Sequence, residues 1–537
     1  MTAPCGGPSD PPRTGVGGLG SGLDGGGKTW RREAPAVLSL LLLGSLAFYR
    51  LLALPAFEDE GTQLRWIFRA IDAGEWLQPL DEGRPLQVWP LVPLVRLAWL
   101  GGNPLVVMRA MNTLAGMTGA VLTYRVATRF GDRWTAWMCG VLFAVCPFVV
   151  YLQRLALADM FLCTAGLCSL LCALRFIESP SHTRATLLAS SLVLAALSKL
   201  PVGFVLMALV PIALVFLPAA ERGVLLRRPL RDRLLYAHGP VVVLAALVTL
   251  IATVRVHEGK SPGFGLQTFA GMALGAEDVA RGYGVRGVSL AGELSAQLSW
   301  PVVAVALSGI VATAVLGSGR DRWLLAVGAL PMLGIALLAR FWFSRYLLFT
   351  LPPLIISAVT GWKAVSRRIG GGRLDVVVFA GCLVVMGRRS ALLIVDPQAA
   401  SWSRVDRIQY IEGGGSGYGY PEAARFILAS HEAPAAVYSL DGHSAYQLQS
   451  HLPSTWRGRV KPIFFGKDGA WLSTEAERAN RLLESTPTWI VAVDETLPHY
   501  LESTLGASRA GLSLPPIATF DKPGARTRVS LWGVTAK

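Results

Sequence analysis

Residues 201–217, PVGFVLMALVPIALVFL, and residues 34–49, APAVLSLLLLGSLAFY, contain no charged side chain. A helix needs about 17–25 predominantly apolar residues to cross the hydrocarbon core of a bilayer. Of the 537 residues in the chain, 52% are hydrophobic and 16% are charged, whereas a typical soluble domain has about 25% charged residues. These features predict an α-helical polytopic membrane protein.

The basic residues indicate how the predicted spans are oriented. Short segments between alternate apolar runs are basic, as at Arg125, Arg129 and Arg133, and cytoplasmic loops carry such an excess. The N-terminus is therefore predicted to be cytoplasmic. The net charge of +15 is spread over these segments, which favours a topology signal over a nucleic-acid partner. We expect about eleven spans in the cell membrane, at 34–54, 103–124, 134–151, 159–177, 185–198, 201–217, 238–256, 297–317, 323–339, 346–362 and 374–395.

Three regions are predicted along the chain. Residues 1–33 are rich in Gly, Pro and Ser and are expected to form a disordered cytoplasmic tail. Residues 34–395 form the transmembrane domain, whose first outer loop, 55–102, contains interfacial helices. Residues 396–537 form an extracytoplasmic α/β domain, because β-rich and helix-like runs alternate there. The strands are expected at 436–440, 462–465, 489–493 and 529–532, and the helices at 421–432, 473–485 and 497–505.

Three carboxylates, Glu58, Asp59 and Glu60, follow directly after the first predicted span. Clustered carboxylates can supply a general base or hold a divalent cation such as Mg²⁺, Mn²⁺ or Ca²⁺. A solvated loop end is the alternative, and activity that resists a chelator would count against a metal. An amphipathic helix at 61–73 and the basic step at Arg84 follow. Together these elements predict a cavity at the membrane surface, suited to a substrate with a lipid tail and a polar head.

Three further groups of charged residues fall on the same predicted face of the membrane: Arg154 with Asp159, Lys199 on a turn between spans, and Arg345 with Tyr346. Each group has a structural explanation. Arg154 and Asp159 can pair with each other near lipid, Lys199 can snorkel, and Arg345 can belong to an aromatic belt. Because all of these residues fall on the same predicted face of the membrane, a role in binding substrate is favoured for the whole set.

The order of these motifs resembles the bacterial protein O-mannosyltransferase and aminoarabinose transferase superfamily, whose members are GT-C glycosyltransferases. The resemblance covers most of residues 34–430, including a stretch from Asp406 to Glu422 that looks like the start of the outer domain in a bacterial subgroup. Two motifs depart from the family pattern, because Arg84 replaces a Lys and Ser198-Lys199-Leu200 replaces Thr-Lys-Gly. The matching pieces are Asp59-Glu60, Arg84-Pro85-Leu86, Arg154 with Asp159, Ser198-Lys199-Leu200-Pro201 and Arg345-Tyr346.

The resemblance implies transfer of one sugar from a polyprenyl-phosphate donor to a hydroxyl acceptor, with inversion at the anomeric carbon. It implies that Asp59 is the leading catalytic base, with Glu60 beside it. It also implies that Arg84, Lys199 and Arg345 bind the donor phosphate. We assign the following residues to the substrate cavity: Arg154, Asp159, Tyr346, Tyr418 and Tyr420.

The glycine-rich stretch before Tyr420 is a candidate lid over this cavity. Gly413, Gly414 and Gly415 predict a mobile turn, and Tyr418 and Tyr420 are candidates to stack on a sugar. A simple linker is the alternative interpretation.

Two other classes of function remain open. A non-enzymatic transporter of lipids or solutes would line a path with charged residues, but the sequence shows no inverted repeat. A glycan ligase or polymerase would also use outer loops, but would lack the early Asp59-Glu60. The acceptor is a protein, a lipid or a glycan, and the sequence does not distinguish among these partners.

Overall fold

The structure is a computed structural model. The chain divides into two compact units, Met1–Ser39 and Leu40–Lys537. In the first unit the structure describes only the beginning of helix α1 (Gly26–Ser45), so most of the predicted tail lies outside the described residues. The described residues are 26–76, 79, 84–98, 103–199, 205–219, 222–223, 228–257, 287–338, 343–369, 374–430, 434, 436–439, 442–456, 459–462, 488–493, 511–512, 516–524 and 527–535.

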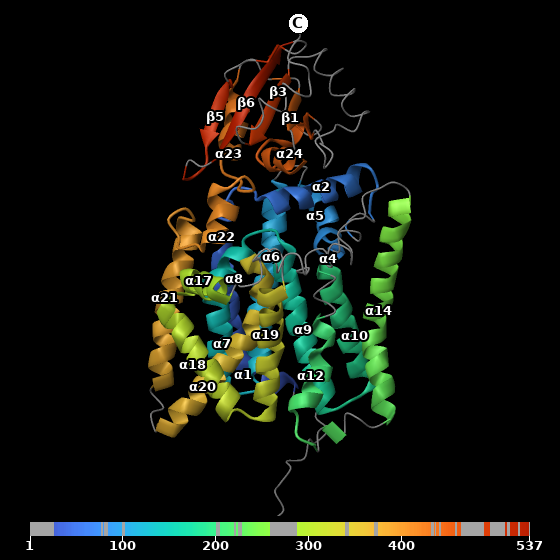
Figure 1. Cartoon of the computed structure of the whole chain (residues 1–537), viewed down its shortest axis with the longest axis vertical. Helices are drawn as coiled ribbons and strands as arrows, with labels where there is room; N and C mark the ends of the chain where they lie inside the picture. The colour runs from blue at the N-terminus through green and yellow to red at the C-terminus, as the bar shows by residue number, and fades with distance from the viewer. Residues whose placement is uncertain are drawn as a thin grey trace, which may run out of the picture. The chain divides into compact units, whose positions relative to one another are not determined.

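Helices make up most of the second unit (Figure 1). Each predicted apolar run overlaps at least one described helix: the run at 34–54 overlaps α1, and the other runs overlap helices that follow it in the chain. They are α2 (Glu58–Asp72), α4 (Pro85–Val88), α5 (Leu91–Ala98), α6 (Pro104–Ala127), α7 (Arg133–Val145), α8 (Pro147–Gln153), α9 (Ala158–Glu178), α10 (His182–Ser198), α12 (Leu209–Phe216), α14 (Arg228–His257), α17 (Gly287–Leu298), α18 (Trp300–Leu316), α19 (Gly319–Leu338), α20 (Leu351–Ile369), α21 (Leu374–Val395) and α22 (Arg404–Arg407). Among the described residues before Tyr420, three short turns of other pitch also occur: the 3-10 turns η2 (Leu46–Phe48) and η3 (Ser344–Thr350), and the π-helical turn η4 (Ile408–Glu412).

Among the described residues, four helices are long and apolar enough to cross a membrane, or six if each of two bent pairs is one span. The bends, of 57° and 116°, fall where Pro147 and Pro301 open α8 and α18, because proline cannot continue the preceding helix. The apolar helices at Glu33–Phe48 and Val205–Phe216 are shorter. The prediction of a multi-pass membrane protein is therefore supported, whereas the number of about eleven spans stays a prediction.

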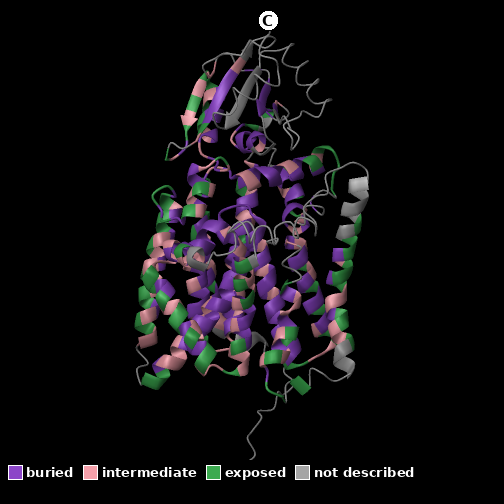
Figure 2. Cartoon of the chain, in the orientation of Figure 1, coloured by how far each residue is buried: buried purple, intermediate pink, exposed green. Residues whose placement is uncertain are grey.

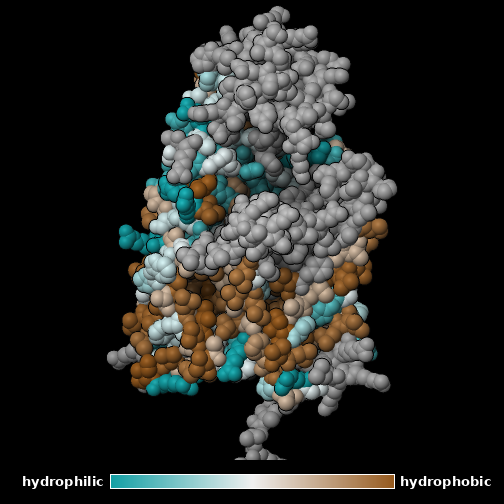
Figure 3. All heavy atoms as spheres, in the orientation of Figure 1, coloured by the Kyte–Doolittle hydropathy of each residue, from teal (hydrophilic) through white to brown (hydrophobic). Residues whose placement is uncertain are grey.

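The surface of the helical part carries many exposed apolar side chains (Figure 3). On α18, Leu307, Val311 and Val315 follow one another at a spacing of four residues, and each is more than half exposed. Residues four apart lie on one face of a helix, so α18 presents a continuous apolar stripe outward. Figure 2 shows that residues between the helices are mostly buried. An apolar outer surface around a buried interior is the arrangement expected of a helical bundle that spans a membrane.

In the C-terminal α/β region, the described residues between 420 and 535 form a six-stranded sheet and two α-helices. The strand order is β2-β1-β3-β6-β4, with β5 also paired to β6. Strands β1, β2 and β3 run parallel, and β6 is antiparallel to its neighbours. The elements are α23 (Tyr420–Ala429), β1 (Ala436–Ser439), α24 (Gly442–Gln449), the 3-10 turn η5 (Ser454–Trp456), β2 (Val460–Pro462), β3 (Thr488–Val493), β4 (Gly511–Leu512), β5 (Ala518–Asp521) and β6 (Arg528–Thr535).

The predicted strands at 436–440, 489–493 and 529–532 coincide with β1, β3 and β6. The run predicted at 462–465 overlaps the end of β2 and otherwise lies outside the described residues, as do the helices predicted at 473–485 and 497–505. Helix α24 was not predicted, because its sequence, GHSAYQLQ, is polar and short.

Candidate active site

Asp59 and Arg345 are far apart in the sequence and form an ion pair, with 2.5 Å between Asp59 Oδ2 and Arg345 Nη1. Asp59 lies in the first turn of α2, where the exposed N–H groups of the helix favour a negative charge. Arg345 lies in η3, directly before α20. The Asp59 side chain is 25% exposed and the Arg345 side chain 7% exposed. The structure therefore brings the predicted base to the rim of a largely buried cation.

Arg345 is surrounded by aromatic rings and keeps an unused hydrogen-bond donor. Its guanidinium carbon lies 4.9 Å from the ring centre of Phe343, 5.7 Å from that of Phe57 and 5.8 Å from that of Tyr346. Its Nε is buried and has no hydrogen-bond partner among the described residues. A guanidinium presents only donors, so this group is arranged to receive a further acceptor, such as an anionic oxygen.

Lys199 and Asp159 form a second ion pair beside the first. Lys199 ends α10, and its Nζ lies 3.1 Å from Oδ1 of Asp159 in the first turn of α9. The same Nζ lies 4.2 Å from the ring centre of Tyr346. Tyr346 thus contacts both Lys199 and Arg345. Residues 200–204, which complete the predicted Ser-Lys-Leu-Pro motif, lie outside the described residues.

Arg84 belongs to the same group of elements. It precedes α4, and its guanidinium carbon lies 5.9 Å from the ring centre of Trp66 on α2. Helix α4 contacts α2, α9 and α10, which carry Asp59, Asp159 and Lys199. Helix α9 also contacts η3, which carries Arg345 and Tyr346. Six of the predicted site residues therefore come from one connected set of elements.

Arg154, which was assigned to the substrate cavity, forms hydrogen bonds with the backbone instead. It is 1% exposed, and its two Nη atoms donate to the carbonyls of Tyr49 at 2.9 Å and Arg50 at 2.7 Å. The alternative interpretation, in which Arg154 pairs with Asp159, is wrong, since Asp159 pairs with Lys199. Arg154 holds the backbone that leads toward α2.

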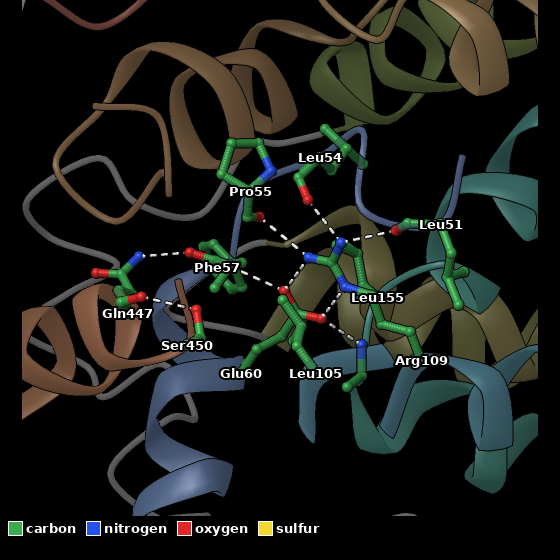
Figure 4. A network of polar contacts seen from close by, with 12 residues as sticks. Leu51, Leu54, Pro55, Phe57, Glu60, Leu105, Arg109, Leu155, Gln447 and Ser450 are labelled. Atoms are coloured by element: carbon green, nitrogen blue, oxygen red, sulfur yellow. Dashed lines mark hydrogen bonds and ion pairs between the residues drawn. The ribbon is translucent and has the colours of Figure 1, made fainter. Parts of the chain in front are cut away.

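A buried network fixes the start of α2 (Figure 4). Arg109 on α6 donates two hydrogen bonds to the carboxylate of Glu60, at 2.8 and 2.6 Å, and both side chains are fully buried. The carboxylate also accepts from the amides of Phe57 at 2.9 Å and Ala156 at 2.6 Å. The remaining donors of Arg109 bond the carbonyls of Leu51, Leu54 and Pro55. Both oxygens of the Glu60 carboxylate thereby accept hydrogen bonds within this network. Glu60 is the residue directly after Asp59 in the chain.

The three carboxylates of residues 58–60 do not converge on one point. Glu60 bonds Arg109 and Asp59 pairs with Arg345, while a carboxylate oxygen of Glu58 lies beside Gly415. Among the described residues, no group of three or more His, Cys, Asp and Glu side chains is arranged to hold a metal ion. The residues predicted as metal ligands therefore fit a shared cation poorly.

The glycine-rich turn is held in place from the C-terminal α/β region. Lys522 is 1% exposed, and its Nζ donates to the carbonyls of Gly413 at 3.2 Å, Gly414 at 2.8 Å and Ser416 at 2.7 Å. The amide of Glu58 in turn donates to the carbonyl of Gly415 at 3.0 Å. This turn supports the start of α2, and the contacts give no support to the predicted mobile lid.

Tyr418 and Tyr420 are not among the residues gathered at Asp59 and Arg345. Tyr420 is fully buried in the core of the C-terminal α/β region, and its hydroxyl donates to Ser444 Oγ at 2.6 Å. Tyr418 is partly buried, and burial raises its pKa to about 12. The assignment of Tyr420 to the substrate cavity is corrected accordingly, because its side chain packs into a hydrophobic core.

A fully buried carboxylate, Asp406, was not singled out from the sequence. It accepts hydrogen bonds from Ser344 Oγ at 2.5 Å, from Ser403 Oγ at 2.9 Å and from the side chain of Gln297. Ser344 is the neighbour of Arg345 and also contacts the hydroxyl of Tyr151 at 3.1 Å. The network therefore ties η3, and with it Arg345, to α17 and α22.

The Asp406 network predicts a dependence of stability on pH. Burial raises the pKa of Asp406 to about 6, although hydrogen bonds from Ser344 and Ser403 oppose this effect. Because the folded protein holds this proton more tightly than the unfolded chain, its contribution to stability is present below pH ~4 and is lost as the pH rises to about 6. The rise in pKa corresponds to about 3 kcal/mol.

We expect Asp406→Asn, which cannot ionise, to lose this dependence. The unfolding midpoint in detergent is compared for the two proteins between pH 4 and pH 7. The difference between variant and parent should move in favour of the variant as the pH rises. Parallel curves over this range would show that Asp406 does not titrate there.

Residues 95–252 match the family model of dolichyl-phosphate-mannose-protein mannosyltransferases, and no curated protein matches the chain. ArnT from Cupriavidus metallidurans bound to undecaprenyl phosphate has a TM-score of 0.58 at 15% identity, covering 94% of this chain and 98% of that one. The apo oligosaccharyltransferase of Archaeoglobus fulgidus has a TM-score of 0.51 at 11% identity, covering 94% of this chain and 75% of that one.

The resemblance predicted from the order of the motifs is thus confirmed. At these identities the solved structures show a common fold, and the family match is an independent finding from the sequence. Together they support a glycosyltransferase activity in which a lipid-linked sugar is transferred to an acceptor. This chain is a multi-pass membrane protein with the GT-C glycosyltransferase fold, similar over residues 95–252 to the dolichyl-phosphate-mannose-protein mannosyltransferases.

Proposed function

We propose that this protein transfers a sugar from a polyprenyl-phosphate donor to a hydroxyl acceptor on the extracytoplasmic side, with inversion. The observation that carries the proposal is the pairing of Asp59 with Arg345 at 2.5 Å, beside Lys199. A base and two cations are what this reaction requires. The N-terminus would be cytoplasmic, and residues 396–537 would form an outer domain on the side of the reaction. ArnT from Cupriavidus metallidurans, which shares the fold, binds undecaprenyl phosphate, and this supports a polyprenyl phosphate as the donor carrier.

The reaction breaks the bond between the anomeric carbon and the phosphate oxygen and forms a bond from that carbon to the acceptor oxygen. The electron pair of the broken bond leaves with the phosphate, where negative charge grows. Arg345, Lys199 and Arg84 stabilise this charge. Asp59 accepts the proton of the acceptor hydroxyl as it attacks. Attack from the face opposite the phosphate inverts the anomeric carbon.

In this mechanism two anions compete for the guanidinium of Arg345: the Asp59 carboxylate and the donor phosphate. Without donor, its guanidinium pairs with Asp59, and a carboxylate that is paired with a guanidinium is a weaker base. An incoming phosphate offers several anionic oxygens to the same guanidinium, including its unused Nε. The donor thereby releases Asp59 to act as the base only when the phosphate is in place.

We expect Arg345→Lys to weaken binding of undecaprenyl phosphate about 10- to 100-fold, the loss expected when charge-assisted hydrogen bonds worth about 1.5–3 kcal/mol are removed. Lysine keeps the positive charge beside Asp59 but not the planar set of donors. Binding is measured by titrating the purified protein with the lipid. Arg425→Lys, at an exposed position on α23, is the control and should bind as the parent does. Unchanged binding by Arg345→Lys would remove Arg345 from the phosphate site.

The function itself is tested with purified protein in liposomes and labelled polyprenyl-phosphate sugars, offered with protein, lipid and glycan acceptors. We expect a labelled product of inverted configuration, formed only from donor on the outer face. Movement of labelled lipid across the bilayer without turnover would favour a transporter instead. Extension of a pre-formed glycan by a whole oligosaccharide block would favour a ligase or polymerase.

A further inference from the structure

Tyr410 lies in the π-helical turn η4, and its hydroxyl is buried without a hydrogen-bond partner among the described residues. Only 3% of the residue is exposed. Buried polar groups are nearly always paired, so an unpaired hydroxyl needs an explanation. Single π-helical turns are rare and occur frequently at functional sites. Two independent features thus distinguish this residue.

Aromatic neighbours fix the position of the Tyr410 ring. Its centre lies 4.7 Å from that of Phe57, 5.6 Å from that of Tyr151 and 6.1 Å from that of Trp402. Phe57 immediately precedes α2 and also packs against the guanidinium of Arg345. The ring is therefore held between the segment that carries Asp59 and the residues that support η3.

The hydroxyl of Tyr410 also lies within electrostatic range of the site. The groups that act on it are Arg345, Asp406, Asp159 and Asp59. Burial raises the pKa of Tyr410 well above its usual value, although Arg345 opposes this effect. The hydroxyl consequently keeps its proton at neutral pH and is available as a donor.

Two buried donors, Tyr410 Oη and Arg345 Nε, lack an acceptor among the described residues, and both side chains pack against the ring of Phe57. A sugar presents hydroxyls that both donate and accept, whereas a phosphate presents only acceptors when it is ionised. We propose that Tyr410 is a further donor-binding residue, whose hydroxyl donates a hydrogen bond to the phosphate of the lipid-linked sugar beside Arg345. The inference rests on the proposed function. As charge grows on the leaving phosphate this hydrogen bond strengthens, so it contributes to turnover as well as to binding.

Tyr410→Phe tests the inference because it removes the hydroxyl and keeps the ring contacts with Phe57, Tyr151 and Trp402. The matched control is Tyr438→Phe, which removes a tyrosine hydroxyl from strand β1 at the same 3% exposure. The full-length protein in detergent is titrated with undecaprenyl phosphate, and binding is read from the rise in its unfolding midpoint. Transfer rates are then measured with the labelled donor.

We expect Tyr410→Phe without lipid to unfold at the same temperature as the parent or higher, because an unpaired buried hydroxyl is lost. Its affinity for undecaprenyl phosphate should fall at least fivefold and its kcat about tenfold. Tyr438→Phe should match the parent in affinity and in kcat.

Two results would overturn the inference. In the first, Tyr410→Phe binds the lipid and turns over within twofold of the parent. In the second, it unfolds at a lower temperature while its affinity is unchanged, which is the result for a purely structural hydroxyl. If the parent itself neither binds undecaprenyl phosphate nor transfers sugar, the proposed function fails, and this inference fails with it.

Discussion

Asp59→Asn lowers the rate of sugar transfer about 10²–10⁴-fold, the range expected when a general base is lost. Asparagine has the size of aspartate and can still accept a hydrogen bond from Arg345, so the protein stays folded. It has no carboxylate to take the proton of the acceptor hydroxyl. The variant should also bind undecaprenyl phosphate at least as tightly as the parent, because Asp59 no longer competes with the phosphate for Arg345. Transfer rate and lipid affinity are measured on the same preparation.

Asp72→Asn is the matched control for this variant. Asp72 is the last residue of α2 and is exposed, so its substitution tests the loss of a carboxylate from the same helix. The control should transfer sugar at the parental rate. Transfer by Asp59→Asn at a rate close to that of the parent would show that another group is the base.

Arg109→Leu should destabilise the protein by about 3–5 kcal/mol, because it leaves the carboxylate of Glu60 buried without its cation. The substitution also removes the donors of three backbone carbonyls between Leu51 and Pro55. The unfolding midpoint in detergent should fall, and transfer should fall with it, since Asp59 adjoins Glu60. The double variant Glu60→Leu with Arg109→Leu should recover part of the loss, because it removes both buried charges.

Arg129→Leu provides the comparison at the surface. Arg129 pairs with Glu178 at 2.9 Å, but its side chain is 38% exposed, and exposed pairs contribute about 0–1 kcal/mol. The midpoint of this variant should therefore stay close to that of the parent. If Arg109→Leu behaves like Arg129→Leu, the buried network does not hold the start of α2.

The sequence predicts those parts of the site that depend on local pattern and order. Apolar runs identify the helices because lipid excludes charge, and the ends of those runs place Asp59, Lys199 and Arg345 on one predicted face. The roles of these three residues rest on the resemblance and on their proximity, and they remain proposals. Their convergence around Tyr346 is what the structure adds.

The sequence does not reveal contacts between residues that lie far apart in the chain. Arg109 lies in an apolar run, and a charged residue in such a run indicates a function or a paired partner. No local sequence pattern, however, identifies Glu60 as that partner. The glycines before Ser416 indicate a mobile turn until Lys522, more than a hundred residues later in the chain, is seen to bond their carbonyls. Tyr410 and Tyr420 look alike in the sequence, and only their packing distinguishes them. Tyr410 lies within electrostatic range of Arg345, whereas Tyr420 lies in a hydrophobic core.

The convergence of base and cations on one lipid phosphate is tested most directly by cryo-electron microscopy of the protein with undecaprenyl phosphate. We expect phosphate density within hydrogen-bond distance of both Arg345 and Lys199, with the Asp59 carboxylate released from Arg345. Phosphate density elsewhere on the protein, with the Asp59–Arg345 pair unchanged, would contradict the account.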